Sequence, residues 1–241
     1  GLRGSEGLGN KVNAIFQLES AFEADTGTPQ TPYFRESWVG VSGALGTLRL
    51  GRSLGPAQRV ASNFDPHGTD GIGSFGSTSL LMRHSALVYQ QNALFYETPN
   101  FGGFRAFVAH QLDESASISG DVTAVSLRYR SKTLEAALAI ADAGLPGNKI
   151  NLFALAYDFC MVRPTVQWHT GKNAGNDWRT SLVGATAPVG TGELRVAYSK
   201  LDQRSGGNDD RTKFAVGYDH PLSKRTRLYG TDARDTRVAT V

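Results

Sequence analysis

Two short motifs in this 241-residue sequence match patterns of catalytic or cofactor sites, but their context argues against both. Residues 51–55 fit the G-x-S-x-G pattern, in which Ser53 would act as a nucleophile, yet Gly55 and Pro56 follow where a helix is required. Residues 71–76 fit the dinucleotide-binding pattern G-x-G-x-x-G, which needs a strand before it and a helix after it. The sequence predicts neither element there. We therefore expect no enzyme activity and no bound cofactor.

Histidine and cysteine side chains could hold a metal or form a disulfide, but the sequence does not group them. The five histidines stand at no spacing typical of metal ligands, and Cys160 is the single cysteine. One cysteine allows neither an intrachain disulfide nor a zinc site built from several thiolates. No metal site is expected.

Charged side chains recur instead at every second position of many segments. In residues 121–130, Val125 and Leu127 alternate with Arg128 and Arg130, and residues 162–169, 194–199 and 213–219 repeat the pattern. Successive side chains of a strand point to opposite faces. Each of these segments therefore predicts a β-strand with one apolar face and one charged face.

Composition narrows the class of protein further. The net charge of +3 is mild and the basic residues are scattered, so we expect no nucleic-acid partner. No apolar run approaches the roughly 18 residues that a membrane-spanning helix needs. A transmembrane β-barrel remains open, because its strands need lipid-facing residues only at alternate positions.

The links between the strand segments alternate in length. Short links fall near residues 6–10, 43–46, 99–103, 131–132, 159–161, 188–192 and 220–224. Mostly longer links, rich in Gly, Asn and Asp, fall near residues 23–33, 53–91, 113–120, 143–149, 171–176 and 204–210. Outer-membrane barrels have tight periplasmic turns on one rim and longer loops on the other. The sequence thus predicts an all-β fold, a transmembrane antiparallel up-and-down barrel of about fourteen strands.

Residues 53–91 break the alternation. A loop of nearly forty residues inside a compact domain is usually functional. Its Gly, Pro, Ser and Asp content suits a loop folded into the lumen of the barrel, where irregular backbone can be solvated. A soluble all-β binding or adhesion module remains an alternative, and such a module would fold without detergent.

Several segments carry more specific motifs. Residues 1–9 read GLRGSEGLG and lead into AIFQLES at 14–20, residues 34–41 read FRESWVGV, and residues 45–52 read LGTLRLGR. Residues 96–104 read YETPNFGGF, and residues 222–226 read LSKRT. Together these motifs resemble the general porins of Gram-negative bacteria, of the neisserial and betaproteobacterial type, over nearly the whole chain.

The resemblance implies a sixteen-stranded, trimeric barrel in the bacterial outer membrane. Such a barrel is a water-filled channel for passive diffusion of small hydrophilic solutes and ions, so the implied partners are outer-membrane lipid, further copies in a homotrimer, and small solutes including anions. The family's first strand is missing, residues 231–241 do not alternate, and Val241 stands where the family has an aromatic residue. We therefore expect about fourteen of the sixteen strands, in a single incomplete barrel domain over residues 1–241.

Two other kinds of barrel remain as alternatives. A substrate-specific channel is the nearest, because the sequence barely separates it from a general porin. A barrel lipase or protease would need a catalytic cluster, and the sequence offers only the weak match at Ser53.

In the family that this chain resembles, the third loop narrows the pore, and basic wall residues oppose acidic loop residues. By that analogy residues 53–91 form the constriction loop, and alternation turns Arg3 and Arg49 into the water of the lumen. Arg52 lies where the loop begins, whereas Arg35 needs a bulge or a rim position to turn inward. The expected eyelet residues are Arg3, Arg35, Arg49, Arg52, Asp65, Asp70 and Arg83.

Alternation also assigns charges to the rest of the lumen wall. The basic residues there outnumber the acidic ones, and an excess of one sign biases which ion enters a narrow aqueous passage. We therefore expect a weak anion preference. The expected lumen-wall residues are Glu19, Arg128, Arg130, Arg163, Arg195 and Lys213, with Glu135, Glu193 and Asp219 as further carboxylates.

Overall fold

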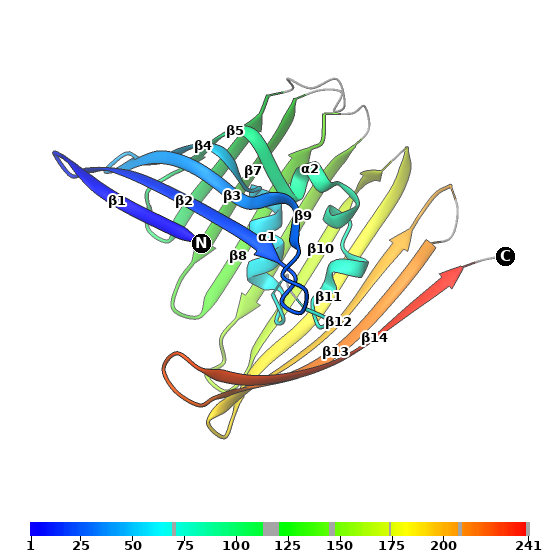
Figure 1. Ribbon diagram of the computed structural model, residues 1–241. Helices are drawn as coiled ribbons and strands as arrows, with labels where there is room; N and C mark the ends of the chain where they lie inside the picture. The colour runs from blue at the N-terminus through cyan, green and yellow to red at the C-terminus, as the bar shows by residue number, and fades with distance from the viewer. Residues whose placement is uncertain (69–70, 113–120, 145–147, 174, 207–208, 240–241) are drawn as a thin grey trace.

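The computed structural model describes residues 1–68, 71–112, 121–144, 148–173, 175–206 and 209–239. These residues form one antiparallel sheet of fourteen strands, in which each strand pairs with its neighbours in the sequence (Figure 1). The strands are β1 (Leu2–Gly9), β2 (Val12–Phe22), β3 (Pro29–Gly43), β4 (Gly46–Leu54), β5 (Tyr89–Glu97), β6 (Phe104–Gln111), β7 (Val122–Arg130), β8 (Leu134–Asp142), β9 (Lys149–Tyr157), β10 (Arg163–Asn173), β11 (Asn176–Val189), β12 (Gly192–Gln203), β13 (Asp209–Pro221) and β14 (Arg227–Ala239).

This single curved layer confirms the predicted up-and-down arrangement of about fourteen strands. A soluble sandwich would have split the strands between two facing sheets. In the part of the chain that the structure describes, β1 and β14 do not pair with each other, so the wall is open between them. Within the same residues, no helix is long and apolar enough to cross a bilayer.

The two faces of the sheet have opposite character, as strand β8 shows. Its alternate residues Ala137, Ala139 and Ala141 are buried on the inner, concave face. Leu138 and Ile140 point outward and are 55% and 59% exposed. A continuous row of large exposed apolar side chains fits a surface that faces lipid. The inner face therefore holds the small and charged side chains.

The link lengths differ between the two rims, as expected. The short link from β1 to β2 consists of Asn10 and Lys11, whose positive φ angles of 48° and 60° are those that a two-residue hairpin turn requires. The link expected at residues 171–176 is much shorter than predicted. Strands β10 and β11 keep pairing as far as Asn173 and Asn176, so only two residues separate them.

Residues 55–88, the inner loop, leave the sheet between β4 and β5. They form α1 (Pro56–Phe64), two 3₁₀ turns, η1 (Phe75–Thr78) and η2 (Leu81–Arg83), and α2 (Ser85–Val88). The alternation pattern did not predict these helices. Proline suits the first turn of α1, because its missing N–H would have had no partner there. The described residues of the inner loop lie inside the curve of the sheet (Figure 1), which confirms the predicted position.

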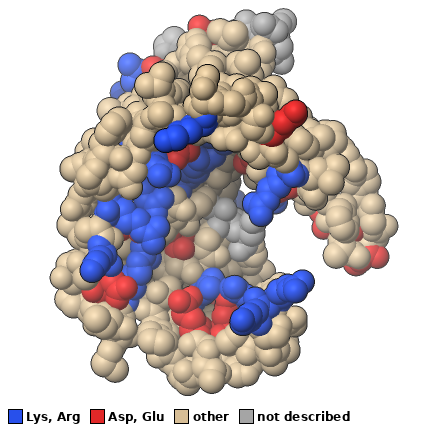
Figure 2. Space-filling model, turned by 90° about the vertical axis from the view of Figure 1, so that its left-hand side faces the viewer, with Lys and Arg blue, Asp and Glu red and all other residues tan. Residues whose placement is uncertain are grey.

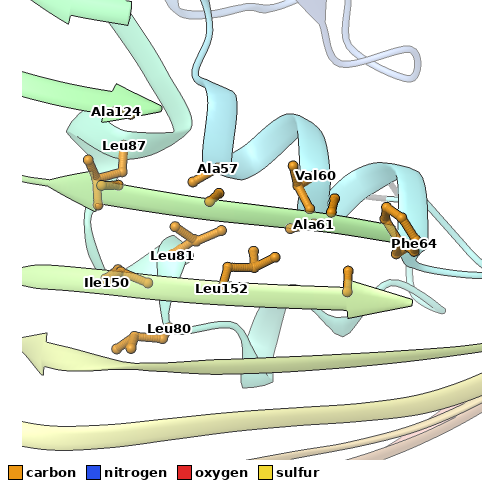
Figure 3. Packing of buried hydrophobic residues seen from close by; sticks show 14 of the residues in the cluster. Ala57, Val60, Ala61, Phe64, Leu80, Leu81, Leu87, Ala124, Ile150 and Leu152 are labelled. Carbon is orange, nitrogen blue, oxygen red and sulfur yellow. The ribbon is translucent and has the colours of Figure 1, made fainter. Parts of the chain in front are cut away.

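An apolar contact holds α1 against strands β7 to β9. Val60, Ala61 and Phe64 pack over the wall, and Ala124 and Leu152 are among the wall residues beneath them (Figure 3). Burying one large side chain such as Phe64 contributes about 1.5–3 kcal/mol. The short alanine side chains of the wall let the helix approach the sheet closely.

Polar side chains of the later strands satisfy the backbone of the inner loop. The amide of Gln167 donates to the carbonyl of Ala61 at 3.0 Å, and the hydroxyl of Thr180 donates to that of Thr78 at 2.9 Å. The Thr180 hydroxyl also accepts from the N–H of Leu80 at 3.0 Å. Irregular backbone is tolerated inside a barrel where such partners replace water.

Candidate functional site

Arg49 lies on the inner face of β4, as predicted, but it does not point into open water. It is 5% exposed, and its guanidinium carbon lies 5.1 Å, 5.6 Å and 5.2 Å from the ring centres of Trp38, Phe95 and Phe107. Its Nη1 donates a long bond of 3.5 Å to Ser53 Oγ. A cation held between aromatic faces is stabilised by their quadrupoles. The expectation of a water-exposed Arg49 is wrong.

The carboxylate of Glu97 accepts hydrogen bonds from two further arginines close to Arg49. Arg59 of α1 donates to Glu97 at 3.3 Å, and Arg105 of β6 donates to the other oxygen at 3.0 Å. Burial lowers the pKa of Arg59, and Glu97 opposes that change. The sequence analysis missed Glu97 and Arg105. Glu97 alternates in phase with buried Phe95, so this signal could have placed it on the inner face.

A second cluster surrounds Glu135, which is buried on the inner face of β8. Arg128 contacts one carboxylate oxygen, Arg163 donates to the other at 3.0 Å, and Arg130 lies 4.0 Å away. All three arginines were predicted for the lumen wall. The structure brings them to a single carboxylate, which leaves an excess of positive charge.

The wall formed by β12 to β14 is more evenly charged. Arg195 contacts Asp219 at 2.8 Å and Glu193 at 3.0 Å, and Arg227 also contacts Asp219, at 3.2 Å. Lys213 lies 3.5 Å from Asp235. Figure 2 looks into the hollow and shows basic side chains gathered on one inner wall, with basic and acidic side chains mixed on the wall below.

The first strands hold the remaining wall residues of the prediction. Arg35 contacts Glu19 at 3.2 Å, because a bulge between β2 and β3 takes Arg35 out of the regular register. Arg3 pairs in register with Gln17 on β2 and is exposed. Gln17 in turn donates to Glu19 at 3.3 Å. Arg3 and Arg35 therefore lie along one stretch of wall around Glu19.

Arg52 does not belong to the inner face. It follows Arg49 by three positions, so strand alternation turns it outward, in phase with exposed Leu50. Its Nη1 donates to Gln91 at 2.9 Å, and its guanidinium lies 5.4 Å from the ring centre of Tyr89. The expected eyelet role of Arg52 is therefore wrong.

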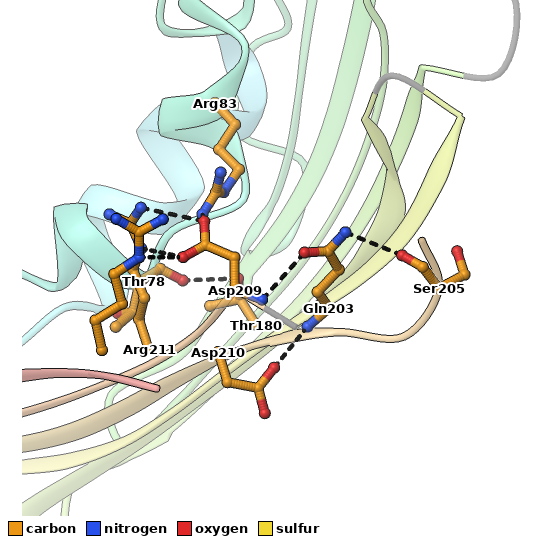
Figure 4. A network of polar contacts seen from close by, with 9 residues as sticks. Thr78, Arg83, Thr180, Gln203, Ser205, Asp209, Asp210 and Arg211 are labelled. Atoms are coloured by element: carbon orange, nitrogen blue, oxygen red, sulfur yellow. Dashed lines mark hydrogen bonds and ion pairs between the residues drawn. The ribbon is translucent and has the colours of Figure 1, made fainter. Parts of the chain in front are cut away.

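Arg83 fastens the inner loop to the wall. Its Nη2 donates to Asp209 of β13 at 2.8 Å (Figure 4). Its guanidinium carbon lies 4.1 Å from the ring centre of Trp178. Asp209 also accepts from Arg211 and Arg237. Arg83 is thus committed to docking the loop and not to opposing charge across the lumen.

Replacing Arg83 by alanine should loosen the end of the inner loop. The variant loses the bond to Asp209 and the contact with Trp178, together about 1–3 kcal/mol. We expect faster amide exchange in residues 81–88 and noisier single-channel current. The control Arg227→Ala removes an exposed arginine that pairs with Asp219 of β13, and it should change neither. Unchanged exchange in Arg83→Ala would contradict this role.

Asp65 ends α1 and is 6% exposed, so it does not present a carboxylate to the lumen. One oxygen accepts from the N–H of His67 at 2.9 Å and the other from the N–H of Phe75 at 3.0 Å. Burial raises the pKa of Asp65 to about 6, although these two N–H groups oppose the rise. The expected eyelet role is replaced by a structural one. Asp70, the other predicted loop carboxylate, lies outside the described residues.

The raised pKa of Asp65 makes the stability of the inner loop depend on pH. The folded state holds this proton more tightly than the unfolded chain, so the stabilisation is complete below about pH 4 and is lost as the pH rises through about 6. A shift of about two units corresponds to at most about 3 kcal/mol. Unfolding of the wild type measured from pH 4 to 8 should show this step, and Asp65→Asn should lack it. Parallel curves for the two proteins would contradict the assignment.

Comparison with known proteins places the chain in a family. It matches the Gram-negative porin family over residues 1–240. It is 32% identical to outer membrane porin protein 32 of Delftia acidovorans, covering 95% of this chain and 72% of the relative, and 27% identical to a Bordetella pertussis outer membrane porin, covering 95% and 74%. The anion-selective porin from Comamonas acidovorans superposes with a TM-score of 0.83 at 30% identity, covering 98% of this chain and 77% of that structure. The chain thus belongs to the Gram-negative porins, the β-barrel channel proteins of the bacterial outer membrane.

Proposed function

We propose that this porin conducts small hydrophilic solutes and favours anions. The observation that carries the proposal is the cluster at Glu135, where one carboxylate meets Arg128, Arg130 and Arg163. A fixed excess of one charge along a narrow aqueous passage raises the local concentration of the opposite ion. The solved relative from Comamonas acidovorans is itself described as anion-selective, which supports the proposal.

In this proposal, the passage is narrowest between the inner loop and the wall formed by β4 to β10. Arg49 of β4, Arg105 of β6 and Arg59 of the loop itself lie there beside Glu97, and they continue the row of basic side chains at Glu135. The facing wall at Arg195 is closer to balance. A solute would therefore meet a field that runs across the passage, and Arg3 and Arg35 add to it near Glu19.

We also propose that the protein assembles as a trimer in the outer membrane. A related fold, OmpT of Vibrio cholerae, is described as a trimer, and it shares the fold at a TM-score of 0.74 and 14% identity. The outer face of the first strands offers an apolar surface for such packing, with exposed Leu2, Val39 and Leu50. Cross-linking in mild detergent should give trimers, and a strictly monomeric protein would contradict the proposal.

Reversal potentials in a salt gradient test the anion preference. Arg163→Gln removes one arginine from the Glu135 cluster and should shift the reversal potential toward cation preference. Arg52→Gln removes the same charge from the outer face and is the matched control, so it should leave the potential unchanged. The wild-type preference should fade as the screening length falls from about 10 Å at 0.1 M salt to about 3 Å at 1 M.

Two results would overturn this proposal. Cation preference of the wild type at low salt would reverse the sign that the arginine clusters predict. A conductance that saturates for one solute alone would favour the substrate-specific alternative.

A further inference from the structure

A basic cavity opens on the outer face of the sheet, at the rim of the longer links. It has a volume of about 600 Å³, and Lys149, Lys172, Arg179 and Arg204 line it with Asp177 as the one lining carboxylate in the described residues. Strand alternation places these charges outward, because Lys149 is in phase with exposed Phe153 and Arg179 with exposed Val183. The charged side chains that line the cavity therefore point away from the channel.

The cavity lies directly beyond the apolar band of the outer face. Trp168 of β10 is 43% exposed and pairs in register with Phe153, and the next outward residue, Thr170, pairs with Arg179. Two residues along a strand span about 6.6 Å. Tryptophan favours the boundary between hydrocarbon and headgroups. In an outer-membrane barrel, this depth on the rim of the longer links is that of the outer-leaflet headgroups.

Arg179 has no carboxylate partner among the residues that the structure describes. Its register partner Asp202 instead contacts Arg204 at 3.1 Å and Lys200 at 3.6 Å. The guanidinium of Arg179 lies 4.6 Å from the ring centre of Trp168, and its Nε is buried without a hydrogen-bond partner. A stacked, unneutralised guanidinium is held in one orientation and keeps its charge for a ligand.

The lysines of the cavity are only weakly neutralised. Lys149 lies 3.4 Å from Asp142, and Lys172 lies 3.8 Å from Asp177, both in exposed pairs. Exposed pairs of this kind contribute about 0–1 kcal/mol. A more highly charged anion can therefore recruit both ammonium groups.

We propose that this cavity binds a phosphate group on the headgroup of an outer-leaflet lipid. The planar guanidinium of Arg179 suits two parallel hydrogen bonds to phosphate oxygens, and Lys149 and Lys172 supply the remaining positive charge. The apolar surface at Trp168 and Phe153 continues below the cavity and suits the acyl chains of the same molecule. The occupant is thus a phosphorylated lipid and not a free anion. This inference rests on the outer-membrane location and not on the proposed ion preference.

Native mass spectrometry of the purified protein in detergent tests the site. The probes are a diphosphorylated glycolipid of the lipid A type and the same lipid without phosphates. The wild type should retain the phosphorylated lipid at least about tenfold more tightly, and Arg179→Ala should lose about tenfold in affinity. Lys132→Ala removes an exposed charge from the opposite rim and is the matched control, with unchanged binding expected.

The remaining outcomes each decide the proposal. The proposal would be overturned if Arg179→Ala retained the phosphorylated lipid as tightly as the wild type does. It would also be overturned if the wild type retained the lipid with and without phosphates equally tightly. Inorganic phosphate that competes as strongly as the lipid would assign the cavity to a free anion and overturn the lipid as its source. If Arg179→Ala does not fold, as a heat-modifiability gel would show, Lys172→Gln changes an exposed side chain and should still weaken lipid retention about threefold. Full retention by that variant would count against the site.

Discussion

Replacing Glu135 by glutamine is expected to destabilise the barrel and to strengthen its anion preference together. The variant keeps the shape of the side chain but leaves Arg128 and Arg163 without their buried counter-charge. Breaking a buried ion pair costs about 3–5 kcal/mol, and partial exposure of the arginines reduces this to about 2–3 kcal/mol. Unfolding in urea, followed by tryptophan fluorescence, measures the loss.

The matched control for this variant is Glu193→Gln. Glu193 contacts Arg195 at 3.0 Å, but its side chain is much more exposed than that of Glu135, so its loss should cost less than about 1 kcal/mol. In planar bilayers at low salt, Glu135→Gln should move the reversal potential further toward anions. Equal stability of the two variants would show that Glu135 does not hold the three arginines together.

The second large effect is expected at Arg49, where two substitutions should separate charge from stability. Arg49→Glu places a buried carboxylate against three aromatic faces and within electrostatic reach of Glu97 and Glu36, so we expect a loss of more than about 4 kcal/mol. Arg49→Met fills the same space without a charge. This variant should stay within about 1 kcal/mol of the wild type, because it removes a desolvated charge and leaves no carboxylate without a partner: Glu97 keeps Arg59 and Arg105.

Conductance measurements complete the test at Arg49. Arg49→Met should fold and show a weaker anion preference at 0.1 M salt, because it removes one charge from the narrow part of the passage. Ser53→Ala is a suitable control, since it removes only the long hydrogen bond to Arg49. A well-folded Arg49→Glu variant would show that the side chain can reach water after all.

The sequence predicted the strands and their inner faces because both follow from an alternation of period two. Arg128, Arg163 and Arg195 all point inward for this reason. Their partners could not be predicted, because a carboxylate such as Glu135 meets arginines from two other strands. The link from Arg83 to Asp209 likewise joins residues 126 positions apart.

Local departures from the regular strand account for the other differences. Arg35 agrees with the prediction, because it turns inward through a bulge, one of the two conditions that the sequence analysis named, although the sequence does not mark where the bulge lies. The carboxylate of Asp65 accepts hydrogen bonds from the N–H groups of His67 and Phe75 at the end of α1, so it interacts within the loop and does not face the lumen. Arg52 was assigned by analogy with the loop entrance, whereas its phase with Leu50 already indicated the outer face.

The alanines beneath α1 have a consequence for how permeability can evolve in this protein. Ala137, Ala139 and Ala154 never meet a solute, yet their size sets the height at which the helix rests above the wall. A larger side chain at any of them would lift α1 toward the axis and reduce the free cross-section, because a packed interior cannot absorb the added volume. The diameter of the pore can therefore change through substitutions at positions that do not line it. Selection on uptake can act at those positions while every charge that a passing ion meets stays the same.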